Sequence, residues 1–496
     1  AGHRVAICEQ VEDPKLAKGI VKREVIEVVT PGTITSDAAL NEKTNQFLAC
    51  IHFHGDDAGY AVLDQSTGEL FIGECLASNL IEALRNYAPR EVLLGSNVVY
   101  STSVWYRELR PFVSTVEDWV LSFDQGQRIL IEHFKVRTLK GFGCADLELG
   151  ITAAGAIFYH VKNSLSGSLT HVTSISPVAD EGIMELDSFT LRNLEVFKSL
   201  ATQGTHGTLI DLLDETLTNG GGRLLKQWLT RPLTDTKKLN DRLNIVAGFV
   251  SNKHQLQQCR SILEDIMDIE RILGKINQSK ASPRDLIGLK QSLNKIPELK
   301  KLLGSVDNNH WSKVIEKFAD TNSVCALVAE QLNDEVPAQI QQGNVFRAGV
   351  DKKLDELRQL AAGGKQWIAD MEKEERQRTG INRLKVGFNK VFGYYLEVSK
   401  AQQDNVPENY IRKQTLVNSE RYITEELKEY EEKVLSAEED IIAIETELFA
   451  NCCQKTLKQA GPIQTNAKIL NRLDVLSTFA YLAIQKKYCK PILLED

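Results

Sequence analysis

Apolar residues in the first third of the chain come in short runs that predict strands. Runs at 47–53, 59–65 and 68–74 are separated by Gly and Asp, which predicts three antiparallel strands. A helical period follows over 79–88, and a continuous apolar run over 91–95 predicts a buried strand after that helix. This part of the chain is therefore expected to mix a sheet with helices.

The middle of the chain has a different pattern. From about residue 164 to 461, apolar residues recur every three or four positions, which predicts an array of helices. One helical stretch stops at Pro232, as a helix does when a proline follows. The part before this array, with three strands, a helix, a strand and further helices, has the order of a ribonuclease-H-like α/β domain, a likeness of topology alone.

Two long heptad-like registers flank one β-rich block between residues 345 and 459. The first register comprises Val350, Leu354, Leu357, Ala361, Gly364, Ile368 and Met371, and the second Leu427, Tyr430, Val434, Ala437, Ile441, Ile444 and Leu448. Such spacing, with charged residues between, is typical of coiled-coil seams. We expect two antiparallel helices over about 345–379 and 423–459, each roughly 50 Å long. The β-rich block must then lie at the far tip of this arm.

The tip differs in charge from the whole chain. Residues 380–422 contain seven basic and four acidic side chains, a net +3 in a chain whose formal net charge is −8. Lys385 and Asn389 share one face of an expected strand, and Arg412 and Gln414 share a face of another. Cationic and amide groups on one sheet face suit contacts to DNA phosphates, which hold position without reading sequence. A solvated sheet face explains the same pattern equally well.

Composition narrows the possible classes. With 42% hydrophobic and 25% charged residues the chain is ordinary globular protein, and its net charge excludes a uniformly basic nucleic-acid coat. We find neither a long apolar stretch that predicts a membrane span nor a secretion leader. Nine cysteines without a CxxC pair predict reduced thiols, with neither zinc nor disulfides. The chain opens in an apparent strand and stops on an apolar run, so we expect a piece cut from a longer protein at both ends.

Candidate catalytic groups are weak. Asp64, Glu69 and Glu74 lie on or near expected strands, but the first strand carries no acid for a two-metal nuclease, so solvated carboxylates are the favoured interpretation. No GxxxxGK[ST] motif occurs, and therefore no Walker A phosphate loop. The glycines of TNGGGR at 218–223 are expected to make a turn into the helix that follows.

Seven strings along the chain resemble one family. They are AICEQVEDPKLAKG, REVIEVVTPGT, LRNLEVF, GGGRLLKQWLTRPL, RQRTGINRLKVGFNKVFGYYLEVS, NYIRKQTLVNSERYITEELKEYEEKVLSAEE and NRLDVLSTFA. Together, and in this order, they resemble the MutS family of bacterial DNA mismatch-recognition proteins. The resemblance covers essentially the whole chain, and its most specific part runs from Lys385 to Tyr430.

The resemblance implies a multidomain, mainly α fold with parts in a fixed order: a ribonuclease-H-like α/β connector, a helical lever core with a long antiparallel arm, and a small β clamp at the arm's tip. The implied parts are 1–37 for the end of the mismatch-binding domain, 38–160 for the connector, 161–364 and 425–488 for the core, 365–424 for the clamp, and 489–496 for the start of an ATPase domain.

The resemblance also implies a function. The family initiates DNA mismatch repair: a dimer encircles DNA, its clamps grip the backbone, and ATP binding shifts the levers. The DNA-binding residues it implies in this chain are Lys385, Asn389, Lys390, Arg412, Lys413, Asn418 and Arg421. No catalytic residue, metal site or cofactor is implied for the chain itself, because ATP and Mg belong to the full-length parent, expected to be a DNA-dependent ATPase.

The implied partners are double-stranded DNA, a second copy in the parent's homodimer, and downstream mismatch-repair proteins that bind the connector. The implied location is the bacterial cytoplasm near the nucleoid, with no membrane contact.

Two departures from the family limit this transfer. The Phe-x-Glu wedge that tests a mispaired base and the Walker motifs have no counterpart in the chain, so we expect neither mismatch discrimination nor ATP hydrolysis from it. Val417 stands where relatives often carry Lys, which weakens one expected phosphate contact. Two other classes remain open, a ribonuclease-H-like nuclease on 45–160 and an SMC-like scaffold arm whose tip binds protein.

Overall fold

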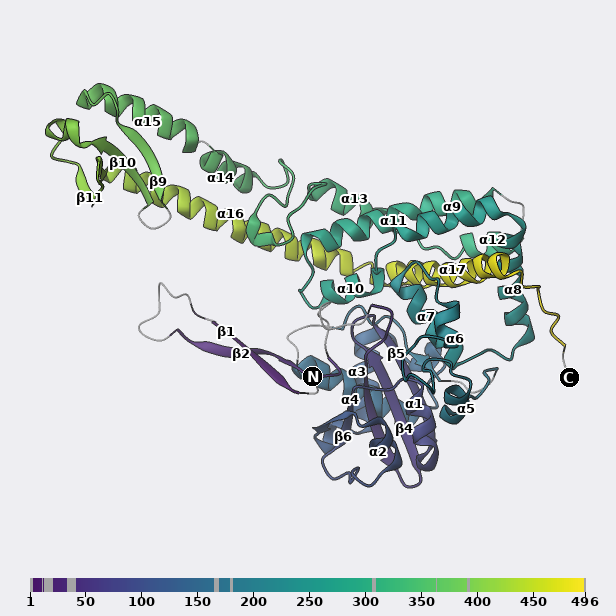
Figure 1. Ribbon diagram of the computed structural model, residues 1–496. Coiled ribbons are helices and arrows are strands. Elements are labelled where there is room, and N and C mark those ends of the chain that lie inside the picture. Colours follow the sequence, from purple (N-terminus) through teal and green to yellow (C-terminus); the bar gives the residue numbers. More distant parts are fainter. Residues whose placement is uncertain are drawn as a thin grey trace. The chain divides into compact units, whose positions relative to one another are not determined.

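The fold is that of a computed structural model, and it forms two compact units. The structure describes residues 3–10, 12, 21–33, 42–164, 169–178, 182–305, 309–362, 364–389 and 393–494. The first unit comprises Ala1–Ala281, Gly288–Ala326 and Cys453–Asp496, and the second Ser282–Ile287 and Leu327–Cys452. About half of the chain is helical, and the strands that the structure describes form three sheets (Figure 1).

An antiparallel ribbon begins the first unit. Strand β1 (Val5–Gln10) pairs with β2 (Arg23–Val29). Just after β2, Thr30 and the backbone N–H of Gly32 donate hydrogen bonds to the buried carboxylate of Glu91, the latter at 3.0 Å. A Cβ at Gly32 would lie 2.8 Å from the Cβ of Glu91, so this close approach requires glycine. The contact attaches the end of the ribbon to the next sheet.

A six-stranded sheet follows. Its strands are β3 (Phe47–His54), β4 (Asp57–Asp64), β5 (Glu69–Leu76), β6 (Glu91–Gly95), β7 (Phe112–Val116) and β8 (Ser176–Pro177). They lie in the order β7-β6-β3-β4-β5-β8, with β3, β4 and β5 antiparallel and the other neighbours parallel. The predicted meander and the buried strand at 91–95 are confirmed. We did not expect β7, which mixes Ser and Thr with its apolar residues, or β8, which has two residues.

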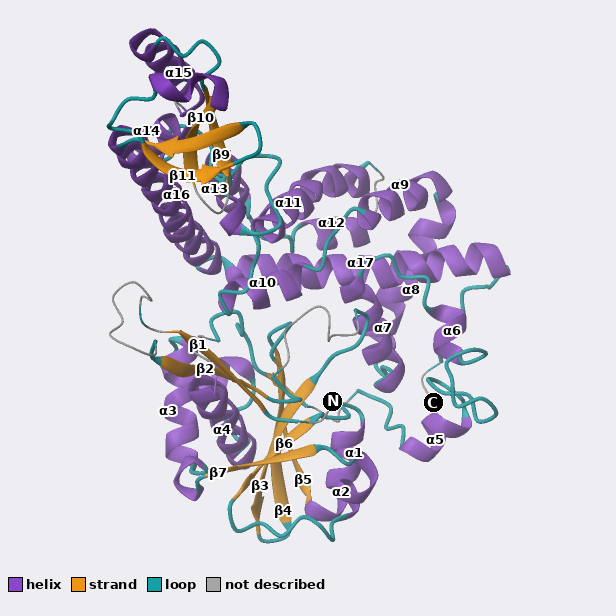
Figure 2. Cartoon of the chain, turned by 60° about the vertical axis from the view of Figure 1, so that its left-hand side comes forward, coloured by secondary structure: helices purple, strands orange, loops and turns teal. Residues whose placement is uncertain are grey.

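Helices cover both faces of this sheet (Figure 2). They are α1 (Leu80–Arg85), α2 (Val104–Leu109), α3 (Phe123–Phe134) and α4 (Glu148–Ser164). Leu48 and Leu93 pack with side chains of α3 and α4, whereas the neighbouring Ala49 and Val92 pack with side chains of α1 and α2. All four side chains are fully buried, two on each face of the sheet, which explains why the sequences of their strands are continuous apolar runs.

The predicted helical array is confirmed and extends to Lys486. Its helices are α5 (Ser188–Asn193), α6 (Leu209–Leu213), α7 (Asn219–Thr230), α8 (Thr236–Ser251), α9 (Lys253–Glu264), α10 (Ile269–Asn277), α11 (Pro283–Gly304), α12 (Asn309–Ile315), α13 (Asn322–Gln331) and α17 (Ala460–Lys486). Among the described helices, none is long and apolar enough to cross a bilayer.

The glycines expected to form a turn lie instead in the first turn of α7. The side chain of Thr218 caps this helix by accepting a hydrogen bond from the N–H of Gly221 at 2.9 Å. Asp474 on α17 in turn accepts hydrogen bonds from the N–H and the hydroxyl of Thr218, both at 2.7 Å. A Cβ at Gly221 would lie 2.2 Å from a carboxylate oxygen of Asp474, so close packing of α7 on α17 explains the glycine.

The second unit contains the predicted antiparallel arm. Arg358 on α14 (Lys352–Ala362) pairs with Glu445 of α16 (Glu425–Leu457) at 2.5 Å. Nine residues further along the chain, Trp367 stacks on Tyr430 of α16 with ring centroids 3.6 Å apart. Residue numbers thus rise along one helix as those of its neighbour fall, which confirms the antiparallel pairing.

The first helix of the arm is shorter than predicted. It begins at Lys352 and not at residue 345, and it continues as a separate element, α15 (Gly364–Thr379). Gly349 has a φ of +87°, outside the helical range, so no helix can include it. Residue 363, between the two helices, lies outside the described residues.

Candidate nucleic-acid interface

A four-stranded antiparallel sheet lies between α15 and α16 in the sequence, and we call it the clamp sheet. Its strands are β9 (Lys385–Asn389), β10 (Gly393–Ser399), β11 (Ile411–Thr415) and β12 (Ser419–Ile423). They lie in the order β11-β12-β10-β9. Because directly opposite residues of paired strands point to the same side, the register decides which side chains share a face.

The arm covers one face of the clamp sheet. Leu396 lies opposite both Val386 and Tyr422, and it is fully buried. These residues belong to an apolar cluster with Met371 of α15 and Leu427 of α16. Both of these helical residues come from the predicted seams, so the seam continues into the core of the sheet.

The other face carries a row of polar side chains, one from each strand, which we call the polar row. It consists of Lys385, Glu397, Arg421 and Gln414, aligned by the strand register. Arg421 contacts Glu397 through Nε at 3.2 Å and donates from Nη1 to Gln414 at 2.9 Å. Its guanidinium also lies 4.2 Å from the ring centre of Tyr395. Lys385 is exposed and has no such partner among the described residues, so its charge is available to a ligand.

A bulge overturns one prediction about this sheet. The pairing of β11 with β12 shifts so that Arg412 lies opposite Tyr422 whereas Gln414 lies opposite Arg421, and Lys413 is the extra residue. Arg412 and Gln414 therefore point to opposite faces, and the prediction that they share a face is wrong. The physical reason is that one inserted residue reverses the alternation of a strand.

Arg412 has a partner that the sequence analysis missed. Its Nη1 lies 3.4 Å from Oε1 of Glu420, whose side chain is 5% exposed, whereas that of Arg412 is 60% exposed. Tyr422 donates its hydroxyl to the same carboxylate, and burial together with this hydrogen bond raises the pKa of Tyr422 to about 12. The alternation of Ser-Glu-Arg was a signal, because it places Glu420 on the face opposite to Arg421.

The remaining predicted residues differ in how much the structure describes. Asn389 ends β9, but its side chain is outside the described part, and Lys390 lies outside the described residues. Lys413 is exposed at the bulge. Asn418 is exposed in the turn before β12, and its carbonyl accepts a hydrogen bond from the N–H of Lys400 at 3.2 Å.

A tyrosine holds the segment before β11 against the arm. Tyr410 donates its hydroxyl to Glu375 of α15, which also forms an ion pair with Arg378 at 2.8 Å. Burial alone would raise the pKa of Glu375, but the hydrogen bonds from Arg378 and Tyr410 hold it below its usual value. The ionised carboxylate thus fixes this end of the clamp sheet to α15.

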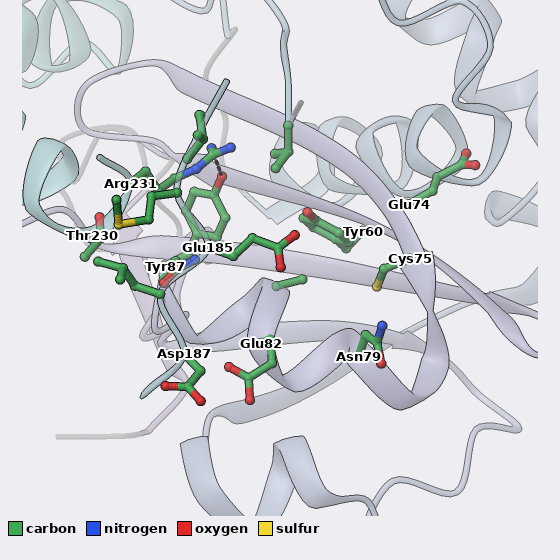
Figure 3. Close-up of a pocket in the computed structure, with 16 residues that line it drawn as sticks. Tyr60, Glu74, Cys75, Asn79, Glu82, Tyr87, Glu185, Asp187, Thr230 and Arg231 are labelled. Carbon is green, nitrogen blue, oxygen red and sulfur yellow. Dashed lines mark hydrogen bonds between the residues drawn. The ribbon is translucent and has the colours of Figure 1, made fainter. Parts of the chain in front are cut away.

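A cavity of about 380 Å³ in the first unit is lined by carboxylates of Glu74, Glu82, Glu185 and Asp187 (Figure 3). Glu74 accepts two backbone N–H bonds at the start of α4, Glu82 pairs with Arg85 at 2.9 Å, and Asp187 caps α5. Within the described part of the chain, no three His, Cys, Asp or Glu side chains are placed to hold a metal ion. Glu74, Glu82 and Asp187 therefore stabilise the fold.

Asp64 and Glu69, the nuclease candidates, do lie together. The side-chain amide of Asn45 donates to both, at 2.9 and 2.7 Å, and Gln227 of α7 donates to Glu69 at 3.0 Å. Burial and the nearby Glu270 raise the pKa of Glu69 to about 7. Asp64 is 1% exposed, so the interpretation of solvated carboxylates is wrong for this pair. Through Gln227, Glu69 connects the six-stranded sheet to α7.

Comparison with known families agrees with this layout. Family models match the chain at residues 1–38 (MutS domain I), 46–173 (MutS domain II) and 189–480 (MutS domain III). The last match alone covers more than half of the chain. The chain belongs to the MutS family. The resemblance seen in the sequence strings is thereby confirmed.

Curated MutS relatives match along the whole chain. The DNA mismatch repair protein MutS of Salinibacter ruber is 41% identical over 99% of this chain and 55% of its own length. That of Flavobacterium johnsoniae is 41% identical over 99% of this chain and 56% of its own length. That of Halothermothrix orenii is 39% identical, and the match covers all of this chain and 56% of the relative. The chain spans about half the length of the curated relatives it matches.

Proposed function

We propose that this chain supplies the connector, the lever helices and a non-specific DNA-backbone clamp of a protein that recognises mismatched DNA and initiates its repair. The observation that carries the proposal is the clamp sheet, whose one face is buried on the arm while the other bears Lys385 and Arg421. Exposed Lys413 stands at its bulged edge. Cations on an open sheet face suit contacts to phosphates, which give affinity without base readout.

The other assignments follow the family. We infer that residues 38–160 form the connector, whose meander with parallel β6 and β7 supports a ribonuclease-H-like topology, and that 365–424 form the clamp. Residues 161–364 and 425–488 are the levers, 1–37 the end of the mismatch-binding domain, and 489–496 the start of an ATPase domain. ATP with Mg, the homodimer and downstream repair partners then belong to the full-length protein in the bacterial cytoplasm.

The proposal is tested by the double change Lys385→Ala with Lys413→Ala, which removes the two exposed cations of the clamp sheet that have no ion-pair partner in the described part of the chain. If the tip contacts phosphates, the loss of two cations weakens binding of every duplex and lowers the slope of log affinity against log salt by roughly 2. Duplex binding is measured by fluorescence anisotropy at several salt concentrations. A thermal melt of each protein shows whether the fold survives the change.

The matched control is Lys352→Ala with Lys353→Ala, two exposed cations at the other end of the arm, at the start of α14. It removes the same charge and should leave the affinity and the salt slope unchanged. Equal effects of the two double changes would show a general charge effect and would place DNA contact elsewhere. Matched and mismatched duplexes should bind alike, and a clear preference for the mismatch would contradict the non-specific clamp.

A further inference from the structure

A cavity lined by cations lies in the first unit between α8, α17 and one end of the six-stranded sheet. Its volume is about 600 Å³, within the range of sites that hold small molecules. Helix α8 contributes Lys238 and Arg242, and α17 contributes Lys468 and Arg472. Lys317, just after α12, adds a fifth cation.

Nearby carboxylates compensate only part of this positive charge, and Lys238 pairs with Asp235 at 3.6 Å. Residues spaced by four lie on one face of a helix, where like charges repel, and both α8 and α17 carry such a pair. Two carboxylates, Glu69 and Asp241, also line the cavity. Glu69 is held by amide donors, and with a pKa near 7 it carries part of a charge at neutral pH. The cavity is therefore positive.

Two arginines in the cavity have free donors. The guanidinium of Arg242 lies 3.4 Å from the ring centre of Trp228, and a stack of this kind fixes its place while its edge N–H groups stay free. Burial and the charge of Arg472 lower the pKa of Arg242 to about 10. The Nε of Arg472 is buried without a hydrogen-bond partner. Neither arginine forms an ion pair within the described part of the chain.

We propose that this cavity binds a small anion with a chain of two or more phosphate groups. Guanidinium groups pair with phosphate oxygens through two parallel hydrogen bonds, and ammonium groups add charge around them. Phe71 and Leu224 form an apolar part of the wall, which suits an organic group attached to the phosphates. The proposal goes beyond the clamp, because no residue of the clamp sheet lines this cavity.

Binding here has a structural consequence. The cavity is lined by β5 of the six-stranded sheet and by helices α7, α8 and α17. An anion held between them neutralises the facing cations and connects the sheet to the helices. Because the ligand binds the folded protein and not the unfolded chain, the melting temperature of the first unit rises as the ligand concentration rises.

The test uses the 496-residue chain, with inorganic tripolyphosphate and ATP, both without Mg, as probes in isothermal titration calorimetry. Lys238→Gln and Lys468→Gln change exposed side chains, so the fold is retained. We expect each to weaken tripolyphosphate binding about tenfold, since a charge-assisted hydrogen bond is worth that factor or more. Lys237→Gln removes the same charge one position away, outside the cavity lining, and should change the affinity less than about twofold. Arg472→Gln should abolish measurable binding.

The two probes separate the possible sources of the phosphate chain. Tighter binding of ATP means that the apolar wall holds an organic group, and equal binding means that the phosphate chain alone is recognised; both support the site. Failure of both probes to bind, or equal losses for Lys237→Gln and Lys238→Gln, overturns the proposal. A loss of duplex DNA affinity in Lys468→Gln, without any tripolyphosphate binding, would make this surface a DNA contact instead.

Discussion

Arg223 in the first unit and Arg421 in the clamp sheet both bind carboxylates, but solvent reaches them to different extents. The side chain of Arg223 is 2% exposed and lies 2.7 Å from Asp268 and 2.8 Å from Glu270. Burial alone would lower its pKa, but the two carboxylates hold it above its usual value. Arg421 is 19% exposed and lies 3.2 Å from Glu397, which is 35% exposed.

The difference shows that burial decides whether a charged residue stabilises the fold or remains available to a ligand. A buried arginine between two carboxylates is closed to a ligand by burial, even though the Nε of Arg223 has no hydrogen-bond partner, and it is needed to keep those carboxylates charged. An arginine in an open sheet face aligns its neighbours and still faces solvent. Lys385 and Lys413 are exposed in the same sheet, and solvent reaches them more fully than either arginine.

The largest expected effect is a loss of stability when the buried Arg223 is replaced. Arg223→Gln removes the nearest cation of both Asp268 and Glu270, and leaves Asp268 with only Arg271 at 3.9 Å. We expect the free energy of unfolding of the first unit to fall by about 3–5 kcal/mol. Urea unfolding followed by circular dichroism measures this loss. A loss below about 1 kcal/mol would show that water or another cation replaces Arg223, and the contrast with Arg421 would disappear.

The next effect depends on pH and concerns Glu69. Its pKa is about 7 in the folded chain and 4.5 in a free side chain, so the folded chain holds a proton that the unfolded chain has released between these values. Stability from this group is full below pH 4.5 and is lost as the pH rises through 7, by on the order of 3 kcal/mol.

Glu69→Gln should therefore be more stable than the unchanged protein at pH 8, and the gap should close at pH 5. The melting temperatures of both proteins across this range give the difference. His171, whose buried ring has a pKa lowered to about 4, titrates in both proteins and cancels in the comparison. A gap that is constant with pH would mean that Glu69 keeps its charge, and so behaves like an exposed carboxylate.

The smallest effects separate the members of the clamp sheet. Arg421→Gln loses the contacts to Glu397 and Tyr395 and should cost about 1 kcal/mol. Lys413→Gln should stay within about 0.5 kcal/mol, since nothing in the described fold depends on its ammonium group. Hydrogen–deuterium exchange of β11 and β12 measures both locally. Equal losses for the two variants would show that Arg421 and Lys413 contribute alike to the stability of the sheet, and that Arg421 is no more structural than Lys413.

Much of the clamp region was predicted from residue patterns. The seam residues Met371 and Leu427 mark the arm, and residues 384–398 were predicted as part of a β-rich block. Which face of the sheet each cation lies on, and whether it is paired, was not predictable, since Arg412 and Gln414 look equivalent in the sequence. A bulge at Lys413 and the partner Glu420, eight residues away, decide it. The bulge leaves no local signal, and without it the alternation around Glu420 does not show that Arg412 meets this carboxylate.

The sequence by itself determined most of the strands and helices, the antiparallel return of the arm, and the family of the chain, because periodicity and local propensity act over a few residues. It did not predict β7, β8 or the later start of α14. The tertiary structure alone decided which charges are buried, paired or free. It brings Gln227 to Glu69 and places Arg242 of α8 beside Arg472 of α17. These partners are far apart in the chain, and their meeting depends on helix packing and strand register.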